Sequence, residues 1–342
     1  MLAAVLHGAH DLRIEARETP EPGLGEIAVR VSAGGICGSD LSYYNKGRVG
    51  DFAVREPLTL GHEVSGTVAT LGAGVDGPAV GTLVAINPSR PCLRCDYCRS
   101  GRSNLCRDMR FLGSAARSPH VQGAFSEIVV LRADQCVPVP PGTDPRVAAC
   151  AEPLAVALHA ISRAGVVFGV NALVAGAGPI GQLVALGLHA AGAARVTITD
   201  IADEPLGIAR AAGAHAVINV AKDPGALDRA EKFDVAFECT GVASVLGDVI
   251  RAARPGGRVI QLGMLPPGGV TVPVNLLMAR EIDLLGSFRF HTAFDQAVTA
   301  LASGRIDVTP ILSGTRPLAD ANAAFALAGD RTRAIKVHLT FD

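Results

Sequence analysis

Six strand-length apolar runs alternate with helical segments in the second half of the chain, and this alternation restricts the fold more than any other feature. The runs are LVAGAG, RVTITD, AVINV, FDVAFECTG, GGRVIQLGM and EIDLLGSF. Segments between them, such as PIGQLVALGLHAAG and SVLGDVIRAAR, are long enough and apolar enough for helices. Alternating strands and helices predict an α/β fold with a doubly wound parallel sheet that helices cover on both faces.

The rest of the chain has a different pattern. In the first 150 residues, EIAVRVSAGG, HEVSGTVATLG and FSEIVVLRAD alternate apolar and polar residues, which predicts half-buried β-strands. After Phe288 come two helical stretches, TAFDQAVTALASG and LADANAAFALAGD, and a last strand, RAIKVHLTF. A chain of 342 residues exceeds one ordinary core, so we expect two domains.

Composition excludes several classes of function. The net charge is −1 and no basic stripe is present, so nucleic acid is not an expected partner. The N-terminus lacks the features of a signal peptide, and glycines interrupt the most apolar region, so we expect no membrane association. These features predict a cytoplasmic protein, in which clustered cysteines more often bind metal than form disulfides.

The GAGPIG segment follows an apolar strand and opens a helix, which is the context that a dinucleotide-binding glycine motif requires. Gly176 permits the tight turn, Gly178 allows close approach of a pyrophosphate, and Gly181 allows close packing of helix on sheet. Asp200 ends the next strand, and its carboxylate can accept hydrogen bonds from ribose hydroxyls but would repel a 2′-phosphate. We therefore expect NAD rather than NADP, although a purely structural glycine turn is the alternative. The expected cofactor-binding residues are Gly176, Gly178, Pro179, Ile180, Gly181 and Asp200.

Four of the eight cysteines lie within fifteen residues, with the spacing C-x2-C-x2-C-x7-C. Four thiolates complete the tetrahedral shell of a structural zinc ion and leave no position for a substrate. An iron–sulfur cluster and free cysteines are the alternatives, but iron–sulfur motifs use a shorter last spacing followed by proline, and Arg107 stands there. The predicted ligands of this closed site are Cys92, Cys95, Cys98 and Cys106.

Three further segments offer ligands for a second, open metal site. ICGSD contains Cys37, LGHEVSG contains His62, and AEPLAVALHA contains Glu152. Each residue alone is more often part of a core than a ligand. Together they supply the three protein ligands that a catalytic zinc needs beside one exchangeable position.

In this order, GGICGSD, LGHEVSG, the four cysteines, AEPLAVALHA and GAGPIG resemble the zinc-dependent medium-chain dehydrogenase/reductase family along the whole chain. The resemblance implies a Rossmann sheet inserted in a GroES-like, β-rich catalytic domain. The implied segments are 1–150 for the catalytic domain, with the zinc lobe at 90–107, then 151–287 for NAD binding and 288–342 for the return to the catalytic domain. It also implies one catalytic and one structural zinc and an assembly as a homotetramer or homodimer.

The resemblance implies a role for each residue of the open site. Cys37, His62 and Glu152 would bind the catalytic zinc, and the glutamate in place of a cysteine resembles the polyol dehydrogenase branch. Glu63 would lie beside the metal and exchange with the other carboxylate. Asp40 would orient the His62 imidazole, and Ser39 would accept the substrate hydroxyl proton. Many relatives carry a histidine where this chain has Ser42, which leaves the exit path of the proton open.

The stretches AINPSRPC, DMRFLGSA and GSFRF resemble those family members that act on a sugar acid. This implies L-idonate as the substrate, with sorbitol, xylitol or threonine as alternatives, and a nucleotide-binding protein without catalysis as a further one. A carboxylate substrate needs a cation, for which Arg110 and Arg289 are candidates. Either arginine could instead form a structural ion pair. Tyr43 is expected to line the pocket or to belong to the core.

Overall fold

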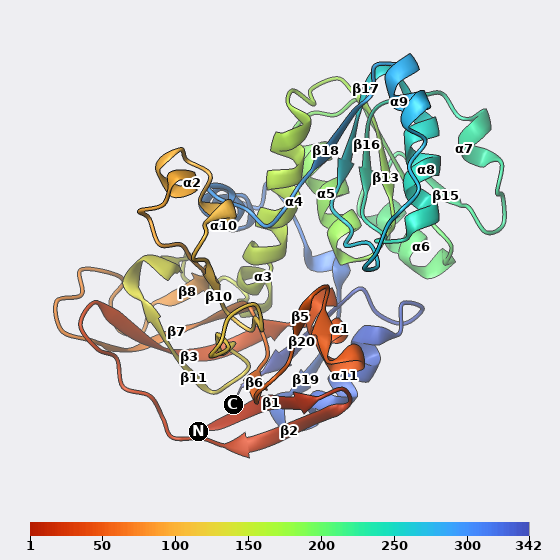
Figure 1. Cartoon of the computed structure of the whole chain (residues 1–342). Coiled ribbons are helices and arrows are strands. Elements are labelled where there is room, and N and C mark those ends of the chain that lie inside the picture. Colours follow the sequence, from red (N-terminus) through yellow and green to blue (C-terminus); the bar gives the residue numbers. More distant parts are fainter. Residues whose placement is uncertain (342) are drawn as a thin grey trace.

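Six parallel strands form the sheet that the alternating apolar runs predict, in the order β15-β14-β13-β16-β17-β18 (Figure 1). The structure is a computed structural model and describes residues 1–341. The strands are β13 (Asn171–Ala175), β14 (Arg195–Asp200), β15 (Ala216–Asn219), β16 (Phe233–Glu238), β17 (Ala253–Gln261) and β18 (Asp283–Gly286). The strand order reverses between β13 and β16, and in such sheets ligands bind at the carboxyl ends beside this reversal.

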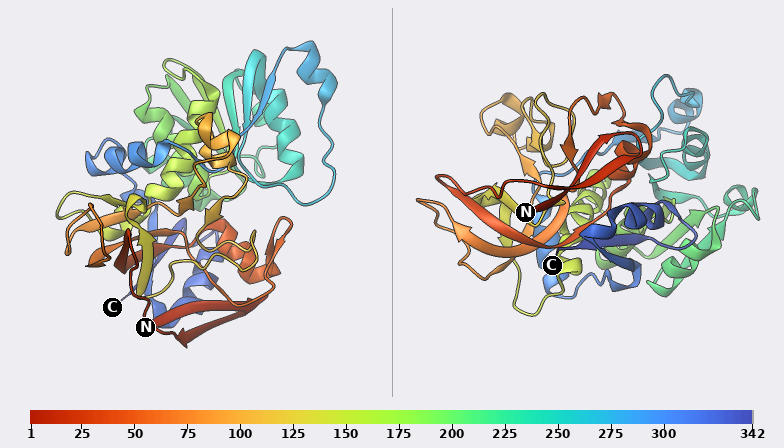
Figure 2. Two further views of the ribbon diagram at one scale, coloured as in Figure 1. Left: turned by 60° about the vertical axis from the view of Figure 1, so that its left-hand side comes forward. Right: turned by 90° about the horizontal axis from the view of Figure 1, so that it is seen from below.

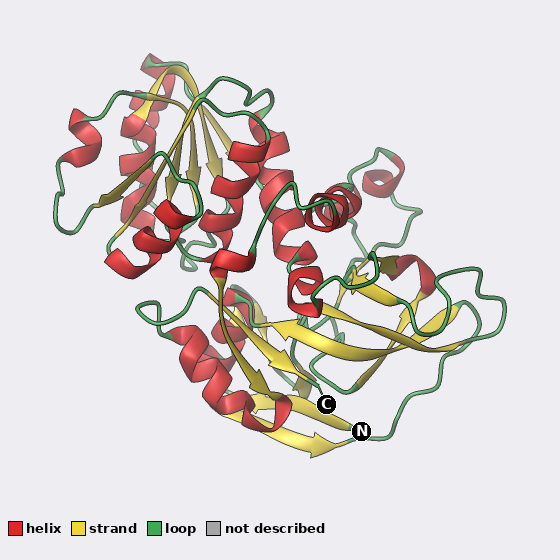
Figure 3. Cartoon of the chain, turned by 180° about the vertical axis from the view of Figure 1, so that it is seen from behind, coloured by secondary structure: helices red, strands yellow, loops and turns green. Residues whose placement is uncertain are grey.

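Helices cover both faces of this sheet, as Figure 3 shows in red around the yellow strands. The apolar residues of one face pack in a core with α4 (Ala151–Ala164), α5 (Pro179–Ala190), α6 (Asp203–Ala211) and α10 (Ala293–Ala302). The other face packs against α7 (Ala226–Arg229), α8 (Ala243–Ala252) and α9 (Val274–Ala279). This double coverage explains why β13 reads as a continuous apolar run, since it is buried on both sides.

A second, mixed sheet of seven strands is built from the two ends of the chain. Its order is β12-β8-β7-β3-β20-β19, and β11 also pairs with β3. β19 and β20 are parallel, whereas the other pairs are antiparallel. The strands are β3 (Glu26–Gly35), β7 (Glu63–Leu71), β8 (Leu83–Ile86), β11 (Ile128–Arg132), β12 (Cys136–Pro138), β19 (Leu312–Pro317) and β20 (Lys336–Thr340).

Smaller elements surround this second sheet. Three short sheets contain β1 (Leu2–Gly8) with β2 (Asp11–Ala16) and β6 (Leu58–Thr59), β4 (Arg48–Val49) with β5 (Phe52–Ala53), and β9 (Ser89–Arg90) with β10 (Arg110–Phe111). The remaining helices are α1 (Gly38–Lys46), α2 (Asp96–Arg99), α3 (Pro145–Ala149), α11 (Ala321–Gly329), η1 (Ser103–Leu105), η2 (Ala133–Gln135), η3 (Thr309–Ile311) and η4 (Leu318–Asp320).

The parallel sheet is thus inserted between two parts of the chain that share one sheet. The chain leaves the seven-stranded sheet through α3 and α4, and it returns after β18 to add β20 beside β3 and β19 beside β20. The N-terminal strand β1 and the last strand, β20, accordingly lie in the same part of the molecule (Figures 1 and 2). The division at residues 150 and 287 stays a prediction. Among residues 1–341, no helix combines the length and apolar character needed to cross a bilayer.

Candidate active site and metal centres

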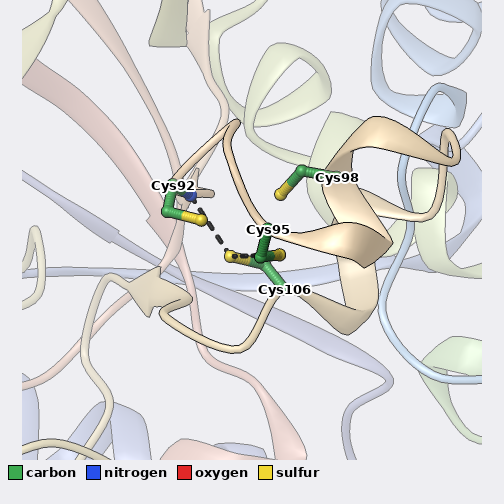
Figure 4. Close-up of side chains that lie close together, drawn as sticks. All are labelled: Cys92, Cys95, Cys98 and Cys106. Atoms are coloured by element: carbon green, nitrogen blue, oxygen red, sulfur yellow. Dashed lines mark hydrogen bonds between the residues drawn. The ribbon is translucent and has the colours of Figure 1, made fainter.

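The four clustered cysteines converge at one point of the 90–107 lobe (Figure 4). Their sulfur atoms all lie within 4.8 Å of one another. Cys106 Sγ accepts N–H groups from the backbone of Cys92 at 3.2 Å and of Asp108 at 3.3 Å. Backbone N–H groups of Cys98 and Arg107 lower the pKa of the Cys95 thiol to about 6, whereas burial raises that of Cys98 to about 12. Four sulfur donors at this separation fit a closed tetrahedral zinc site.

The end of β3 assembles the second group of possible ligands. Gly35, the last residue of β3, pairs with Glu63 of β7 on one side and with His338 of β20 on the other. Cys37 follows two residues later, and His62 immediately precedes β7. The sulfur of Cys37, a ring nitrogen of His62 and a carboxylate oxygen of Glu63 lie within 4.8 Å of one another. This donor set fits a zinc ion with three protein ligands.

Glu152 lies beside this group but outside the set of three mutually close donors. It stands in the first turn of α4 and is 5% exposed. Burial raises the pKa of its carboxyl to about 7, and the nearby His62 opposes this shift. The structure therefore groups Glu63, rather than the expected Glu152, with Cys37 and His62. Which of the two carboxylates binds the metal stays a prediction.

Lys336 is a residue of this site that sequence reasoning missed. Its Nζ forms an ion pair with Glu63 Oε2, and both side chains are 1% exposed. The same Nζ donates a hydrogen bond to the Ile36 carbonyl at 3.2 Å. Burial alone would lower the pKa of Lys336, but the Glu63 carboxylate, together with Cys37 and Cys150, outweighs burial and raises the pKa. The signal was available, since a lysine inside the apolar strand RAIKVHLTF needs a buried partner.

Asp40 and Ser39 flank the His62 ring. His62 Nδ1 is 3.6 Å from Asp40 Oδ1, and Ser39 Oγ is 3.4 Å from Nε2. Asp40 is fully buried and accepts N–H bonds from Cys37 at 3.0 Å and from Gly61 at 3.3 Å. Its carboxylate thus links the start of α1 to the His62 loop. Ser42, by contrast, is turned away, since its hydroxyl donates to the Arg48 carbonyl at 2.9 Å.

The two candidate arginines differ in their surroundings. The Arg289 guanidinium stacks 4.4 Å from the centre of the Phe111 ring, and that ring lies 5.5 Å from the His62 ring. Burial lowers the pKa of Arg289, while nearby Glu152 and Tyr43 oppose this shift. Arg110 is exposed, and successive side chains of a strand point to opposite faces, so it points away from the side of Phe111. Arg289 therefore lies close to the candidate metal ligands His62 and Glu152, whereas Arg110 points toward solvent.

Of the two roles that the sequence left open for Tyr43, the structure shows the core position, and a role in lining the pocket stays a prediction. Tyr43 is 4% exposed and belongs to the core of the seven-stranded sheet. Its hydroxyl oxygen accepts the Ala115 N–H at 3.0 Å. The ring is therefore fixed in position, close enough to Arg289 to affect the pKa of the guanidinium.

The glycine motif forms a cradle at the carboxyl end of β13. Gly176 has φ 101°, and a Cβ on Gly181 would lie 1.8 Å from the Gly176 carbonyl oxygen. A Cβ on Gly178 would meet nothing within 4 Å, so open space faces the helix start. Gly178 caps α5, Pro179 is its first residue and Ile180 its second. A helix N-terminus with free N–H groups beside open space fits the pyrophosphate of a dinucleotide.

Asp200 ends β14 next to this cradle. Its Oδ2 accepts the Ala177 N–H at 2.8 Å, and its Oδ1 accepts the Ile201 N–H at 2.7 Å. These bonds fix the carboxylate without using all of its acceptor positions. Sequence reasoning missed a second fixed carboxylate, Glu238, which is fully buried at the end of β16 and accepts the Thr240 N–H at 2.7 Å. Both carboxylates thus lie at the carboxyl ends of strands that flank β13, beside the point where the strand order reverses.

Comparisons with known proteins agree with this arrangement. Family models match residues 23–141 as an alcohol dehydrogenase GroES-like domain and residues 179–303 as a zinc-binding dehydrogenase. L-idonate 5-dehydrogenase (NAD(P)(+)) of Escherichia coli strain K12 is 42% identical over 317 residues, which cover 92% of this chain and 91% of that protein. Sorbitol dehydrogenase of Gallus gallus is 37% identical over 349 residues, covering 100% of this chain and 96% of the relative.

A solved structure extends the similarity to three dimensions. The crystal structure of L-idonate 5-dehydrogenase from Escherichia coli K-12 has a TM-score of 0.93 and 38% identity, and covers 99% of this chain and 98% of that one. The predicted combination of a GroES-like part and a Rossmann-type parallel sheet is confirmed. The chain belongs to the zinc-dependent medium-chain dehydrogenase/reductase family, whose members are alcohol and polyol oxidoreductases.

Proposed function

We propose that this dehydrogenase oxidises a secondary hydroxyl of a sugar acid with NAD, as an L-idonate 5-dehydrogenase that converts L-idonate to 5-keto-D-gluconate. One observation supports the acid over a neutral polyol. Within residues 1–341, the Arg289 guanidinium stacks on the rings of Phe111 and Phe288 and forms no hydrogen bond or ion pair with a carboxylate. A half-buried cation beside the metal ligands suits the carboxylate of an incoming substrate. The similarity to the Escherichia coli enzyme supports the same substrate.

The chemistry requires that a hydroxyl lose its proton while the attached carbon loses a hydride. A zinc ion held by Cys37, His62 and one of Glu63 and Glu152 would supply a Lewis acid that lowers the pKa of the hydroxyl. Ser39, 3.4 Å from His62 Nε2, is the proposed acceptor of the proton. Arg289 would hold the carboxylate end, and the glycine cradle would hold the dinucleotide that takes the hydride.

Asp200 supports the preference for NAD over NADP. Its carboxylate is fixed by backbone N–H groups at the end of β14, where a ribose is expected in this fold. A fixed negative charge there favours two free hydroxyls and repels a 2′-phosphate. Replacing Asp200 by alanine should lower the ratio of kcat/KM with NAD to that with NADP. An unchanged ratio would show that another residue discriminates.

A substrate panel tests the proposal. We expect kcat/KM with NAD to be highest for L-idonate among L-idonate, D-gluconate, sorbitol, xylitol and L-threonine. Arg289→Ala should raise KM for L-idonate far more than KM for sorbitol, because only the acid loses an ionic partner. Arg110→Ala, which changes an exposed arginine of the same region, should leave both constants close to the wild-type values.

The alternative outcome is a sorbitol or xylitol dehydrogenase. The 37% identity to a sorbitol dehydrogenase along the full chain favours this second candidate. A higher kcat/KM for sorbitol than for L-idonate, with similar effects of Arg289→Ala on both, would establish it and overturn the sugar-acid proposal.

We further propose a homodimer or homotetramer in the cytoplasm. β18 is an edge strand of the parallel sheet, and the apolar side chains of Val274, Met278 and Leu284 on or near it are exposed. A reducing compartment would also keep the four-cysteine cluster available for metal. Light scattering on the wild type and on Leu284→Lys tests the assembly, which the lysine should weaken. A wild type that is monomeric at micromolar concentration would exclude it.

A further inference from the structure

We infer that Asn104, in the four-cysteine lobe (residues 90–107), is a positioning residue for Arg289. The amide of Asn104 donates a hydrogen bond to the Phe288 carbonyl at 3.0 Å, across 184 residues of sequence. The lobe thus grips the peptide bond immediately before the arginine proposed to bind the substrate carboxylate. This inference rests on the proposed function and adds to it a structural link between the lobe and substrate recognition.

Arg289 has a backbone conformation that needs external support. Its φ is 53°, in the left-handed region that residues with a side chain seldom adopt. Residues in such conformations persist where their surroundings hold them, and they concentrate at functional sites. The segment before Arg289 is held from the parallel sheet, because the Ser287 N–H donates to the Gln261 carbonyl at 3.0 Å. The next residue, Phe288, is held by the lobe instead, through the hydrogen bond from Asn104.

The hydrogen bond from Asn104 acts on the geometry of Arg289 directly. A peptide bond is planar, so fixing the direction of the Phe288 carbonyl also fixes the N–H of Arg289. The side chain then projects from a backbone whose orientation on its N-terminal side is set. Asn104 is 7% exposed, so water does not readily replace its amide as the donor.

The lobe holds Asn104 rigidly. The residue lies in the short helix η1, which the Cys106 N–H closes by donating to the Ser103 carbonyl at 3.0 Å. Cys106 belongs to the four-cysteine cluster two residues further on. Any ion bound there would therefore fix the turn that presents the amide of Asn104.

The same region supplies a second contact to Arg289. Phe111, just beyond the lobe, packs with Cys106 and Met109 in a small apolar cluster beside the other three cysteines. Its ring lies 4.4 Å from the guanidinium, a distance at which a cation is attracted to the face of an aromatic ring. The backbone of Arg289 is thus held by Asn104 of the lobe, and its side chain by a ring that packs on the cysteine cluster.

The test uses the full-length, zinc-loaded enzyme and the variant Asn104→Asp, which keeps the shape of the side chain but replaces the donor by an acceptor. We expect KM for L-idonate to rise about tenfold, the factor that corresponds to the loss of one hydrogen-bond equivalent. We expect kcat and the KM for sorbitol to change much less. The matched control is Asn322→Asp, because Asn322 also donates to a backbone carbonyl, that of Leu12 at 3.2 Å, on the far helix α11.

The decisive measurement is the double variant Asn104→Asp/Arg289→Ala. If Asn104 acts through Arg289, Asn104→Asp should have no further effect on KM once Arg289 is alanine. Additive effects of the two substitutions, or equal effects of Asn104→Asp on kcat and on both KM values, would overturn the inference. If Asn104→Asp loses zinc or does not fold, Asn104→Ser carries the same test, with and without Arg289→Ala.

The experiment separates this inference from the proposed function. A wild type that prefers sorbitol refutes the sugar-acid function. The coupling between Asn104→Asp and Arg289→Ala is then measured on the KM for sorbitol. Strong coupling there would still support Asn104 as the positioning residue. A KM that does not depend on Arg289 for any substrate of the panel would overturn the positioning role as well.

Discussion

At the scale of single residues, the buried pair of Glu63 and Lys336 is the feature that most shapes the metal site. Both side chains are 1% exposed, and a Cβ on Gly35 would lie 2.5 Å from Glu63 Oε2. A buried charge without its partner is strongly destabilising, because desolvation is no longer offset. Lys336 therefore supplies the positive charge that Glu63 needs when no cation is bound beside it.

Lys336→Met should lower the free energy of unfolding of the metal-free protein by about 3 kcal/mol, since it leaves Glu63 as a buried, unpaired carboxylate. The loss should be smaller with zinc present, because the cation would lie next to the same carboxylate. Urea denaturation with and without zinc measures both values. The double variant Glu63→Gln/Lys336→Met should recover much of the loss, and an equal loss in both conditions would contradict the explanation.

Glu152 predicts a pH dependence of stability. Burial raises the pKa of its carboxyl from 4.5 to about 7 in the folded protein. The folded state therefore favours the protonated form, and this relative stabilisation is present below the unfolded pKa and is lost as the pH rises toward 7. As the pH rises from 4.5 to about 7, the free energy of unfolding of the metal-free wild type should fall by up to about 3 kcal/mol relative to that of Glu152→Gln. Each pKa unit corresponds to roughly 1.4 kcal/mol.

The measurement is the free energy of unfolding of chelator-treated protein from acidic to neutral pH. Glu204→Gln is a matched control, because Glu204 is an exposed glutamate in the first turn of α6. A difference between wild type and Glu152→Gln that does not change with pH would show that the carboxyl titrates normally.

At the scale of elements, the start of α5 shows how one turn can serve packing and binding with different glycines. A Cβ on Gly181 would lie 1.8 Å from the Gly176 carbonyl oxygen, so this position serves the packing of helix on strand. A Cβ on Gly178 meets nothing within 4 Å, so this position has no packing role in the chain itself. The absence of a side chain at Gly178 therefore matters only for a ligand that approaches the start of α5, such as the pyrophosphate of a dinucleotide.

These two glycines give a paired prediction. Gly178→Ala should leave the thermal midpoint unchanged and weaken NADH binding, because the added methyl group occupies the space expected for a pyrophosphate. Gly181→Ala should lower both the thermal midpoint and the affinity for NADH, since the methyl group cannot be placed without moving the turn. Calorimetric unfolding and NADH fluorescence titration check the pair, and equal effects of the two substitutions on both quantities would contradict the division of roles.

The end of β3 is the other element that decides the site. The pairing of Gly35 with Glu63 and with His338 sets β7 and β20 on its two sides. The sequence predicted each of these strands from its alternation or its apolar run. It could not predict which strands are neighbours, because pairing depends on contacts between residues that are distant in sequence.

At the scale of the whole molecule, two separate donor groups predict two zinc ions for each chain. Cys98→Ser should remove one zinc ion and lower the thermal midpoint, because the lobe loses a closed four-ligand site that contributes to folding. Cys37→Ser should remove the other ion and the activity, with a smaller effect on the thermal midpoint. Metal analysis by mass spectrometry, together with calorimetry on both variants, measures these outcomes. A single zinc ion in the wild type would contradict the prediction.

The sequence by itself determined those parts of this protein that depend on contiguous residues. The six strands of the parallel sheet, the glycine turn at 176–181 and the four-cysteine lobe each depend on residues within one loop or one strand–helix unit, where spacing fixes the local geometry. The candidate ligands Cys37 and His62 also stood out, since their segments match the family in order.

Only the tertiary structure decided the contacts between distant segments. Lys336 reaches the Ile36 carbonyl across 300 residues, and Asn104 reaches Phe288 across 184. The same holds for the choice between Arg289 and Arg110. They have the same side chain but differ in burial, because Arg289 follows β18 into the site and Arg110 lies on the exposed face of β10. The physical reason is that burial and pairing are properties of the packed chain, whereas a sequence records only the chemistry of each side chain and its distance along the backbone.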